Sequence, residues 1–505
     1  MSDLVFLPAH QLAQMIRDRQ VSAVEVVDAY LAQIAKYNSK LNAICTSDEH
    51  TARSKAQQAD AALAHGENWG ALHGVPITVK DVFATAGLRT TAGSVSLKDY
   101  VPQQDATAVA RLRSAGAIVL GKTNIGDLAG GYQGLNDVFP RVNNPWNLEY
   151  TPGGTSSGGA AAIAAGLAPI DLCSDLGGSI RQPAHFCGIY GFKPTDRLVP
   201  TTGHIPEVPG APRCLRQMLT VGTLARSIED LSLCLQIIAG ADRFQPDIPP
   251  VSLGHVIAKP LENLRIAWVD EWANYPVATE IKSAMRSVAT KLTGAGVAVE
   301  EWVPDFDFLA AWQTYYELVT YNLVYARSLT MADIRQNLAF LWREATQGDR
   351  EFRKLGNLAK IGVPISLNPT LKGYFETLTQ RDRFTTQMDE ALSQWDVWLC
   401  PVAMTPAFTH RDRGAAIQVD DRHVPYSMAS GAYVVPFNLT GHPVVVIPIP
   451  RSGGYANGQT QSGLPIGMQI VGKRWQDLDL LEIARELDRI VGNFQQPAGY
   501  RGDRD

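Results

Sequence analysis

The sequence lacks the features that mark disulfide-rich, metal-binding and membrane-spanning proteins. Its six cysteines are scattered over 505 residues without a CxxC pair, so buried free thiols are expected. The ten histidines show no HExxH motif or paired spacing, and no metal site is indicated. No stretch approaches the roughly 18 consecutive apolar residues that cross a bilayer. We therefore expect neither a bound metal nor a membrane partner.

Charge of one sign is also scarce. The net charge is −5, and there is no basic arm or run of like charge, which argues against a nucleic-acid partner. Residues 1–8 lack the charged start and long apolar core of a signal peptide, so a cytoplasmic location is expected. What the chain does have is a composition of 45% hydrophobic and 19% charged residues, typical of a folded globular protein.

Short apolar runs alternate with helical patterns along the chain. The runs expected to be buried strands are residues 75–79, 118–120, 189–192, 264–269, 397–400, 444–447 and 468–471. The helical patterns between them include residues 106–115, 160–165, 227–239 and 278–292. This alternation predicts an α/β fold: a mixed, mostly parallel, twisted sheet with helices on both faces.

One large domain covering residues 1–505 is favoured over two tandem domains. It begins with helices within residues 1–68, where Ser22 and Glu25 form a capping-box pattern. A helical insertion is expected at about residues 305–395, because strand-like runs flank it on both sides. Five aromatic residues of this insertion have spacings that place several on one helix face: Trp312, Tyr315, Tyr316, Tyr321 and Tyr325. Such a stripe fits either a hydrophobic core or a lid over a substrate.

Two pattern matches are misleading. Residues 116–123 fit the phosphate-binding pattern GxxxxGK[ST], but their four middle positions are apolar and favour a strand. Residues 154–158 fit the GxSxG nucleophile elbow, yet the segment before them is a polar loop rather than a strand. Neither nucleotide binding nor an α/β-hydrolase elbow is therefore expected.

Two glycine-rich loops and one lysine offer a more specific chemistry. Lys80 ends the apolar run 74–79, where burial would lower the pKa of its amine and make it a base. The loop 153–159 supplies hydroxyls, although a plain helix start reads the same. In the loop 175–181, Gly177 and Gly178 let backbone N–H groups converge near Ser179. Asp175 and Arg181 flank this loop and are expected to pair across it.

Together these segments resemble the amidase signature family. The matching residues are 74–76, 80–81, 121–124, 144–147, 153–159, 175–181, 188–195, 436–443 and 463–469. The resemblance spans about residues 70–485, and its central 50 residues are the most specific.

The resemblance implies a role for individual residues. The family's nucleophile falls on Ser179, its lysine base on Lys80, and its bridging cis-peptide serine on Thr155. The backbone oxyanion hole is implied at three positions: Leu176, Gly177 and Gly178. Ser156 falls on the supporting serine that follows the bridge. The family tends to have small residues around positions 171 and 173, where this chain has Asp171 and Cys173.

Threonine at position 155 leaves three possibilities for the proton relay. Thr155 keeps the hydroxyl, but its extra methyl restricts χ1 in a tight loop. Thr155 bridges as a serine would, or Ser156 takes over the role, or the relay is impaired and the chain is a weak catalyst.

The resemblance implies a cofactor-independent amidase that cleaves a small-molecule amide through a Ser179 acyl-enzyme. A homodimer is an expected assembly. One alternative is the glutaminase subunit of a glutamyl-tRNA amidotransferase, which shares Lys80-Asp81 and residues 90–94. Residues 123–128 differ from that subunit's usual acidic-phenylalanine stretch. A catalytically weak or non-catalytic binding protein with the same fold is a further alternative.

Overall fold

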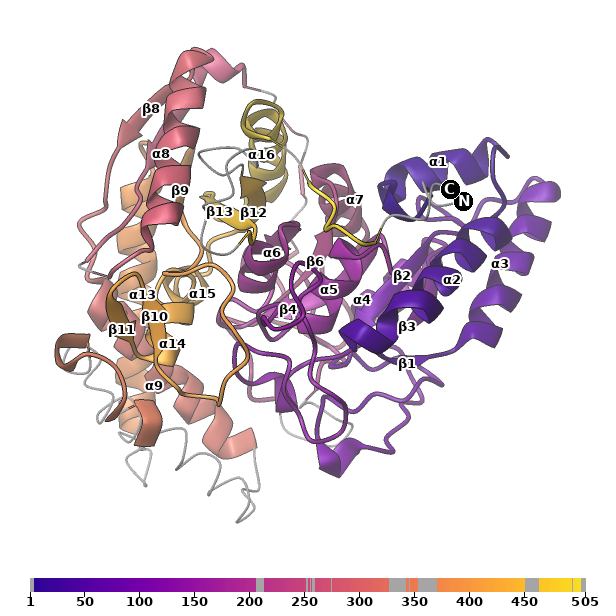
Figure 1. The fold of residues 1–505 in the computed structure, drawn as a ribbon, viewed down its shortest axis with the longest axis horizontal. Coiled ribbons are helices and arrows are strands. Elements are labelled where there is room, and N and C mark those ends of the chain that lie inside the picture. The colour runs from indigo at the N-terminus through magenta and orange to yellow at the C-terminus, as the bar shows by residue number, and fades with distance from the viewer. Residues whose placement is uncertain are drawn as a thin grey trace.

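A long mixed sheet organises the computed structural model, which describes residues 4–205, 213–250, 253–254, 256, 259–273, 275–326, 342–344, 346–352, 370–449, 463–492 and 494–500. Within these residues, eleven strands run in the order β1-β3-β2-β4-β6-β5-β12-β13-β9-β7-β8 (Figure 1). Their bounds are β1 (Ile44–Ser47), β2 (Pro76–Lys80), β3 (Ile118–Thr123), β4 (Ile170–Asp175), β5 (Tyr190–Lys193), β6 (Thr220–Ala225), β7 (Arg265–Trp268), β8 (Ala298–Glu301), β9 (Val397–Pro401), β12 (Val444–Ile449) and β13 (Ile466–Val471). A separate hairpin pairs β10 (Ile417–Val419) with β11 (Arg422–Val424).

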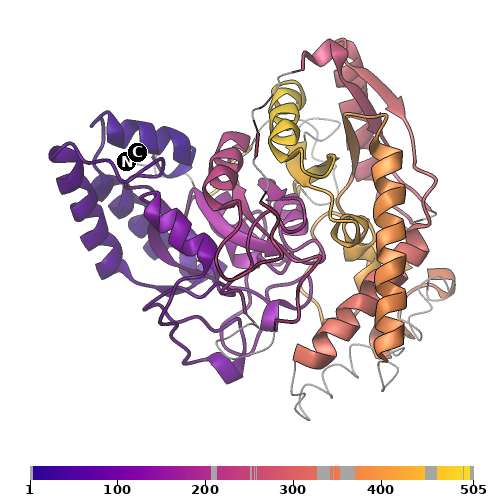
Figure 2. The ribbon, with the colours of Figure 1, turned by 180° about the vertical axis from the view of Figure 1, so that it is seen from behind.

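Helices accompany the sheet along its whole length. Their bounds are α1 (Ala9–Arg17), α2 (Ala23–Leu41), α3 (Glu49–Ala64), α4 (Thr107–Ser114), α5 (Ser157–Ala164), α6 (Arg181–Cys187), α7 (Ile228–Ile238), α8 (Thr279–Gly294), α9 (Phe308–Ala326), α13 (Leu371–Leu392), α14 (Tyr426–Gly431), α15 (Val435–Leu439) and α16 (Asp477–Val491). Figure 2 shows α1–α3 at one end of the molecule, while α8, α9 and α13 lie at the other. The short 3₁₀ turns are η1 (Leu4–Phe6), η2 (Val95–Leu97), η3 (Asp127–Ala129) and η4 (Leu261–Asn263).

The α/β class with a mixed sheet is confirmed, and parallel pairing occurs in two blocks. Strands β3-β2-β4 are parallel at one side, and β9-β7-β8 are parallel at the other. Between these blocks the pairs are antiparallel, because β6 lies between β4 and β5 and because β12 and β13 pair antiparallel with each other. The sequence predicted β5, β12 and β13 as strands but missed β6, and its alternation of strand and helix patterns does not reveal that these pairs are antiparallel.

Residues 1–68 contain α1, α2 and α3 but also the strand β1, and the capping box at the start of α2 is present. Ser22 Oγ accepts from the Glu25 amide at 3.0 Å, and Glu25 Oε2 accepts from the Ser22 amide at 2.8 Å. Residues 118–123 of the GxxxxGK[ST] match form β3, so this segment is a buried strand as expected and not a phosphate-binding loop.

The expected helical insertion contains α9 and α13, while residues 327–341, 345 and 353–369 within it lie outside the described residues. In the aromatic stripe, Trp312 and Tyr315 are 2% and 5% exposed, so both side chains are buried. The side chain of Tyr325 lies outside the described residues.

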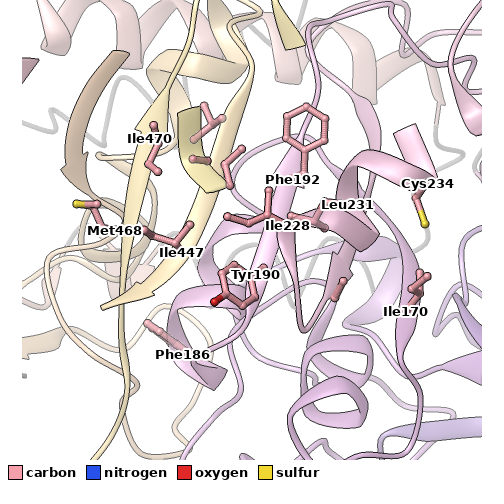
Figure 3. Packing of buried hydrophobic residues seen from close by; sticks show 14 of the residues in the cluster. Ile170, Phe186, Tyr190, Phe192, Ile228, Leu231, Cys234, Ile447, Met468 and Ile470 are labelled. Atoms are coloured by element: carbon pink, nitrogen blue, oxygen red, sulfur yellow. The ribbon is translucent and has the colours of Figure 1, made fainter. Parts of the chain in front are cut away.

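One cluster of buried apolar side chains extends along the sheet from the β3-β2-β4 block to the β9-β7-β8 block. In Figure 3, Ile228 and Leu231 of α7 lie close to Phe192 of β5. Ile447 of β12 and Met468 of β13 belong to the same buried cluster. Because strands from both sides share one core, the loops at the strand ends rest on a rigid support.

Candidate active site

The site lies at the ends of two neighbouring parallel strands. Lys80 is the last residue of β2 and Asp175 the last of β4, and these strands pair in the sheet. Parallel neighbours bring their carboxyl ends to one edge, which is the usual place for a site in such sheets. The loop 176–180 continues from β4 into α6, and the loop 153–156 enters α5, which packs on β4.

Lys80 is a buried amine with neutral hydrogen-bond partners. Its Nζ donates to Thr155 Oγ1 at 2.7 Å, to the Ser174 carbonyl at 3.2 Å and to Ser174 Oγ at 3.4 Å. Burial lowers the pKa of Lys80 to about 8, against the opposing effects of Cys173, Asp175 and Asp171. A neutral amine able to accept a proton is therefore accessible close to neutral pH.

The two glycine-rich loops meet beside this amine. The Gly154–Thr155 peptide bond is cis, as the resemblance implies. The Ser156 amide donates to the Ser179 carbonyl at 3.2 Å, and the Gly154 amide donates to Gln182 Oε1 at 3.2 Å. The side chains of Thr155 and Ser179 are both nearly buried. The loops that carry the bridging hydroxyl and the expected nucleophile are thus tied directly together.

Ser156 lies at the start of α5, in a different position from Thr155. Its Oγ is buried beside the Cys173 thiol and forms no standard hydrogen bond with any described residue. Among the described residues, Lys80 donates to Thr155 and Ser174 but not to Ser156. This geometry favours Thr155 over Ser156 as the group next to the lysine.

Asp175 and Arg181 form a buried ion pair across the second loop. Arg181 Nη2 donates to Asp175 Oδ1 at 2.9 Å and Arg181 Nε to Oδ2 at 3.1 Å. Oδ2 also accepts from the Ile180 amide at 3.0 Å, and Oδ1 accepts from Asn438 Nδ2 at 2.9 Å. Burial alone would raise the pKa of Asp175, but the Arg181 guanidinium and these donors hold it well below its usual range. The carboxylate therefore stays ionised and shapes the loop.

The backbone donors of the loop differ from the expected set. The Gly178 amide donates to Asp175 Oδ1 at 2.8 Å, so it is already occupied. No described residue accepts a hydrogen bond from the amides of Leu176, Gly177 or Ser179. Gly178 has a φ of +102°, and a methyl group added there would lie 2.6 Å from Val434 Cγ2. The structure therefore corrects one expectation: Gly178 provides the turn, while the Ser179 amide is open.

Two tyrosines that the sequence did not assign to the site hold the other side of this loop. Tyr132 Oη donates to the Gly177 carbonyl at 3.1 Å, and Tyr315 Oη donates to the Leu176 carbonyl at 3.1 Å. Burial raises the pKa of both hydroxyls, so they remain protonated donors. Tyr315 lies on α9, far along the chain, and its place in an aromatic stripe carried no signal of this contact.

A histidine behind Lys80 also went unnoticed in the sequence. His204 Nε2 lies 2.9 Å from Ser174 Oγ, and its ring packs edge-on against Phe83. Burial, together with the Lys80 charge, lowers the pKa of His204 to about 3, so the ring is neutral. It supports the serine that contacts the lysine. No motif spacing links residue 204 to residue 80.

The described residues contain no group of three or more histidine, cysteine, aspartate or glutamate side chains placed to hold a metal ion. In the same part of the chain, no helix is long and apolar enough to span a bilayer. The arrangement instead joins a buried amine, two hydroxyl-bearing loops and open backbone amides. These are the parts that acyl transfer through a serine requires.

Comparison with known proteins agrees with this geometry. The model of the Amidase family matches residues 25–481. A curated relative, one of the subunits of glutamyl-tRNA(Gln) amidotransferase from Roseiflexus sp. (strain RS-1), is 33% identical over 491 residues, covering 94% of each chain.

Solved structures share the fold over nearly the whole chain. A crystal structure of an amidase is 25% identical with a TM-score of 0.75, covering 96% of this chain and 100% of that one. 6-Aminohexanoate cyclic dimer hydrolase complexed with substrate has a TM-score of 0.78 at 23% identity, covering 98% of this chain and 99% of that one. The second likeness is one of fold alone.

Proposed function

Since the chain belongs to the amidase family, we propose that it hydrolyses a carboxylic amide, with Ser179 as the nucleophile and Lys80 as the base. Thr155 carries the proton between them. The observation that supports this assignment most directly is the 2.7 Å hydrogen bond from the buried Lys80 amine to Thr155 Oγ1. A serine hydroxyl needs an adjacent base to become a nucleophile, and the base here is reached through a second hydroxyl.

The reaction runs in two halves. Neutral Lys80 accepts the Thr155 proton while Thr155 accepts the Ser179 proton, and Ser179 Oγ attacks the carbonyl carbon of the amide. The negative charge that develops on the carbonyl oxygen is stabilised by the open backbone amides of Leu176, Gly177 and Ser179.

The tetrahedral intermediate then collapses to an acyl-enzyme. The C–N bond breaks, and the proton held on Lys80 returns through Thr155 to the leaving nitrogen. Water hydrolyses the acyl-enzyme by the same relay, releasing the acid and restoring the Ser179 hydroxyl. No step requires a cofactor.

The amide of glutamine is a second candidate substrate. It is favoured by the relative from glutamyl-tRNA(Gln) amidotransferase, which is 33% identical over 94% of both chains. In that case the chain would belong to a larger assembly and would supply ammonia to its partners. The difference at residues 123–128 does not alter any residue of the proposed relay.

The two candidates are separated by assay and by purification. Purified protein is tested on aliphatic, aryl and fatty amides and on glutamine, alone and with candidate partner subunits. Turnover by the isolated chain, purified as a monomer or the expected homodimer, supports a free-standing amidase. Copurification with other proteins of an amidotransferase, and glutamine hydrolysis only in their presence, supports membership of such an assembly.

The relay is tested at residue 155. Thr155→Ser is expected to retain amide hydrolysis, whereas Thr155→Val is expected to lower kcat about 10²–10⁴-fold, because only a hydroxyl relays protons. Full activity in Thr155→Val would contradict the bridging role. Covalent labelling by a serine-directed fluorophosphonate is expected to disappear in Ser179→Ala, and labelling that persists there would reject Ser179 as the nucleophile.

A further inference from the structure

Asp171 is a buried carboxyl close to Lys80 that the proposed reaction does not use. It lies on β4 opposite Thr78 of β2, two residues before the end of β2 at Lys80. Because side chains alternate along a strand, Thr78 and Lys80 point to the same face of the sheet. Asp171 shares that face, and its side chain is fully buried.

Neutral groups hold the Asp171 carboxyl in place. Thr123 Oγ1 donates to Oδ1 at 3.1 Å, and the Cys173 thiol donates to Oδ2 at 2.7 Å. Gly159 of α5 covers the carboxyl, and a methyl group added at that glycine would lie 2.0 Å from Oδ2. The layer between α5 and the sheet thus has room for this carboxyl only because the helix residue above it is a glycine.

The other buried carboxyls around the site have cations of their own. Asp175 pairs with Arg181. The positive charge that acts most on Asp81 is that of Lys122, and Asp81 in turn is the main negative charge acting on Lys122. A weaker effect of Asp171 also reaches Lys122.

Asp171 forms no direct ion pair with any described residue; burial raises its pKa, and the charge of Lys80 opposes that rise. The remaining titratable neighbours of Lys80 are neutral near pH 7. Burial raises the pKa of the Cys173 thiol well above its ordinary value, and His204 has its pKa lowered to about 3. Of the two aspartates that act on Lys80, Asp175 is paired with Arg181, whereas Asp171 has no directly bound cation among the described residues.

We propose that Asp171 is a positioning residue that sets the basicity of Lys80, by stabilising the ammonium that forms when Lys80 accepts the proton from Thr155. This inference rests on the proposed function, because it assigns the proton acceptor to Lys80. A carboxylate in a layer from which water is excluded acts on a nearby amine more strongly than it would in water. The departure from small residues at positions 171 and 173 thus adds a counter-charge to the relay.

The decisive measurement is the pH dependence of acylation in Asp171→Asn and Asp171→Ser. Both variants remove the negative charge, so Lys80 loses its proton at lower pH. The acid limb of kcat/KM, and of fluorophosphonate labelling of Ser179, is expected to move down by about one pH unit. The plateau rate is expected to fall, because a weaker base drives proton transfer less well.

Two matched controls change the same network without changing its charge. Cys173→Ser and Thr123→Val each alter a neutral donor to Asp171, so the acid limb is expected to stay at the wild-type pH even where the rate changes. A merely structural role for Asp171 would lower the rate in all four variants without moving the limb. An acid limb at the wild-type pH in both Asp171 variants overturns the proposal. Thermal unfolding identifies the variants that fold. If Asp171→Asn does not fold, the measurement is made on Asp171→Ser.

A direct titration separates this inference from the proposed function. The ¹⁵N NMR signal of Lys80 Nζ, assigned by its loss in Lys80→Met, is followed against pH in wild type and in Asp171→Ser. A midpoint that falls in the variant supports the charge coupling even if no amide is hydrolysed, in which case the proposed function alone is rejected. An unchanged midpoint overturns the inference whatever the activity.

Discussion

Two aspartates four residues apart on β4 show how differently one protein can use the same buried side chain. Asp175 is held by a guanidinium, by backbone amides and by Asn438, and its pKa lies well below the ordinary range. Asp171 is held by hydroxyls and a thiol, and burial raises its pKa. Both side chains are fully buried, so burial does not explain the difference. The difference in pKa comes from the charge of the partner, which is a guanidinium for Asp175 and neutral groups for Asp171.

The two aspartates also differ in role: Asp175 supports the loop, and Asp171 lies near the proposed proton relay. A carboxylate that cannot lose its charge is suited to fixing a loop, and Asp175 fixes the one that carries the open amides beside Ser179. A carboxyl whose ionisation depends on a neighbouring charge can respond when that neighbour gains or loses a proton. Asp171 lies beside the amine that is proposed to gain and lose that proton.

The largest expected effect is that of Asp175→Asn. It leaves the buried Arg181 without its counter-charge, and breaking such a pair costs roughly 3–5 kcal/mol of the free energy of unfolding. Urea denaturation measures this loss, and Asp171→Asn is the matched variant on the same strand. Because Asp171 has no directly bound cation, its amide variant is expected to lose far less. A loss in Asp175→Asn no greater than in Asp171→Asn would remove the distinction between the two carboxyls.

An intermediate effect is expected from Gly159→Ala. The added methyl group would displace the Asp171 carboxyl, and overpacking of this kind costs about 1–3 kcal/mol. In the Asp171→Ala background the two obstructing atoms, Oδ2 and Cγ, are gone, and alanine is about 1 kcal/mol better than glycine inside a helix. The same substitution is therefore expected to become neutral or stabilising. Urea denaturation of the four proteins in this cycle measures the coupling, and strictly additive effects would show that Asp171 does not lie under α5.

The smallest effect is the pH dependence of stability, and it has opposite signs at the two positions. The folded pKa of Asp175 is depressed, so its stabilising contribution is present above the unfolded value near 3.8 and is lost as pH falls. The folded pKa of Asp171 is raised, so its contribution is present below that value and is lost as pH rises.

Unfolding free energies measured from pH 3 to pH 7 test these signs. The gap between wild type and Asp175→Asn is expected to narrow towards pH 3. Over the same range, Asp171→Asn is expected to gain relative to wild type as pH rises. Parallel curves for the two variants would show that the carboxyls titrate alike.

Much of the site follows from residues close together in the chain. The glycines at 153–154 and 177–178, the serine at 179 and the lysine at the end of an apolar run are local patterns. Each pattern indicates a local backbone conformation or the chemistry of its own side chain. The placement of strands at residues 76–80, 118–123 and 170–175 then brings these patterns to one edge of the sheet.

The sequence by itself determined the α/β class, the glycine-rich loops and the amine at a strand end, because each depends on hydrophobic pattern or glycine content, and the family resemblance implied that the amine meets Thr155. Only the tertiary structure decided that Tyr132 and Tyr315 hold the loop carbonyls, that the Gly178 amide is occupied, and that Asp171 faces Lys80. Those contacts join side chains from different strands, helices and loops. Which groups meet there depends on packing and on charge in an interior without water. No local stretch of the sequence encodes these long-range contacts.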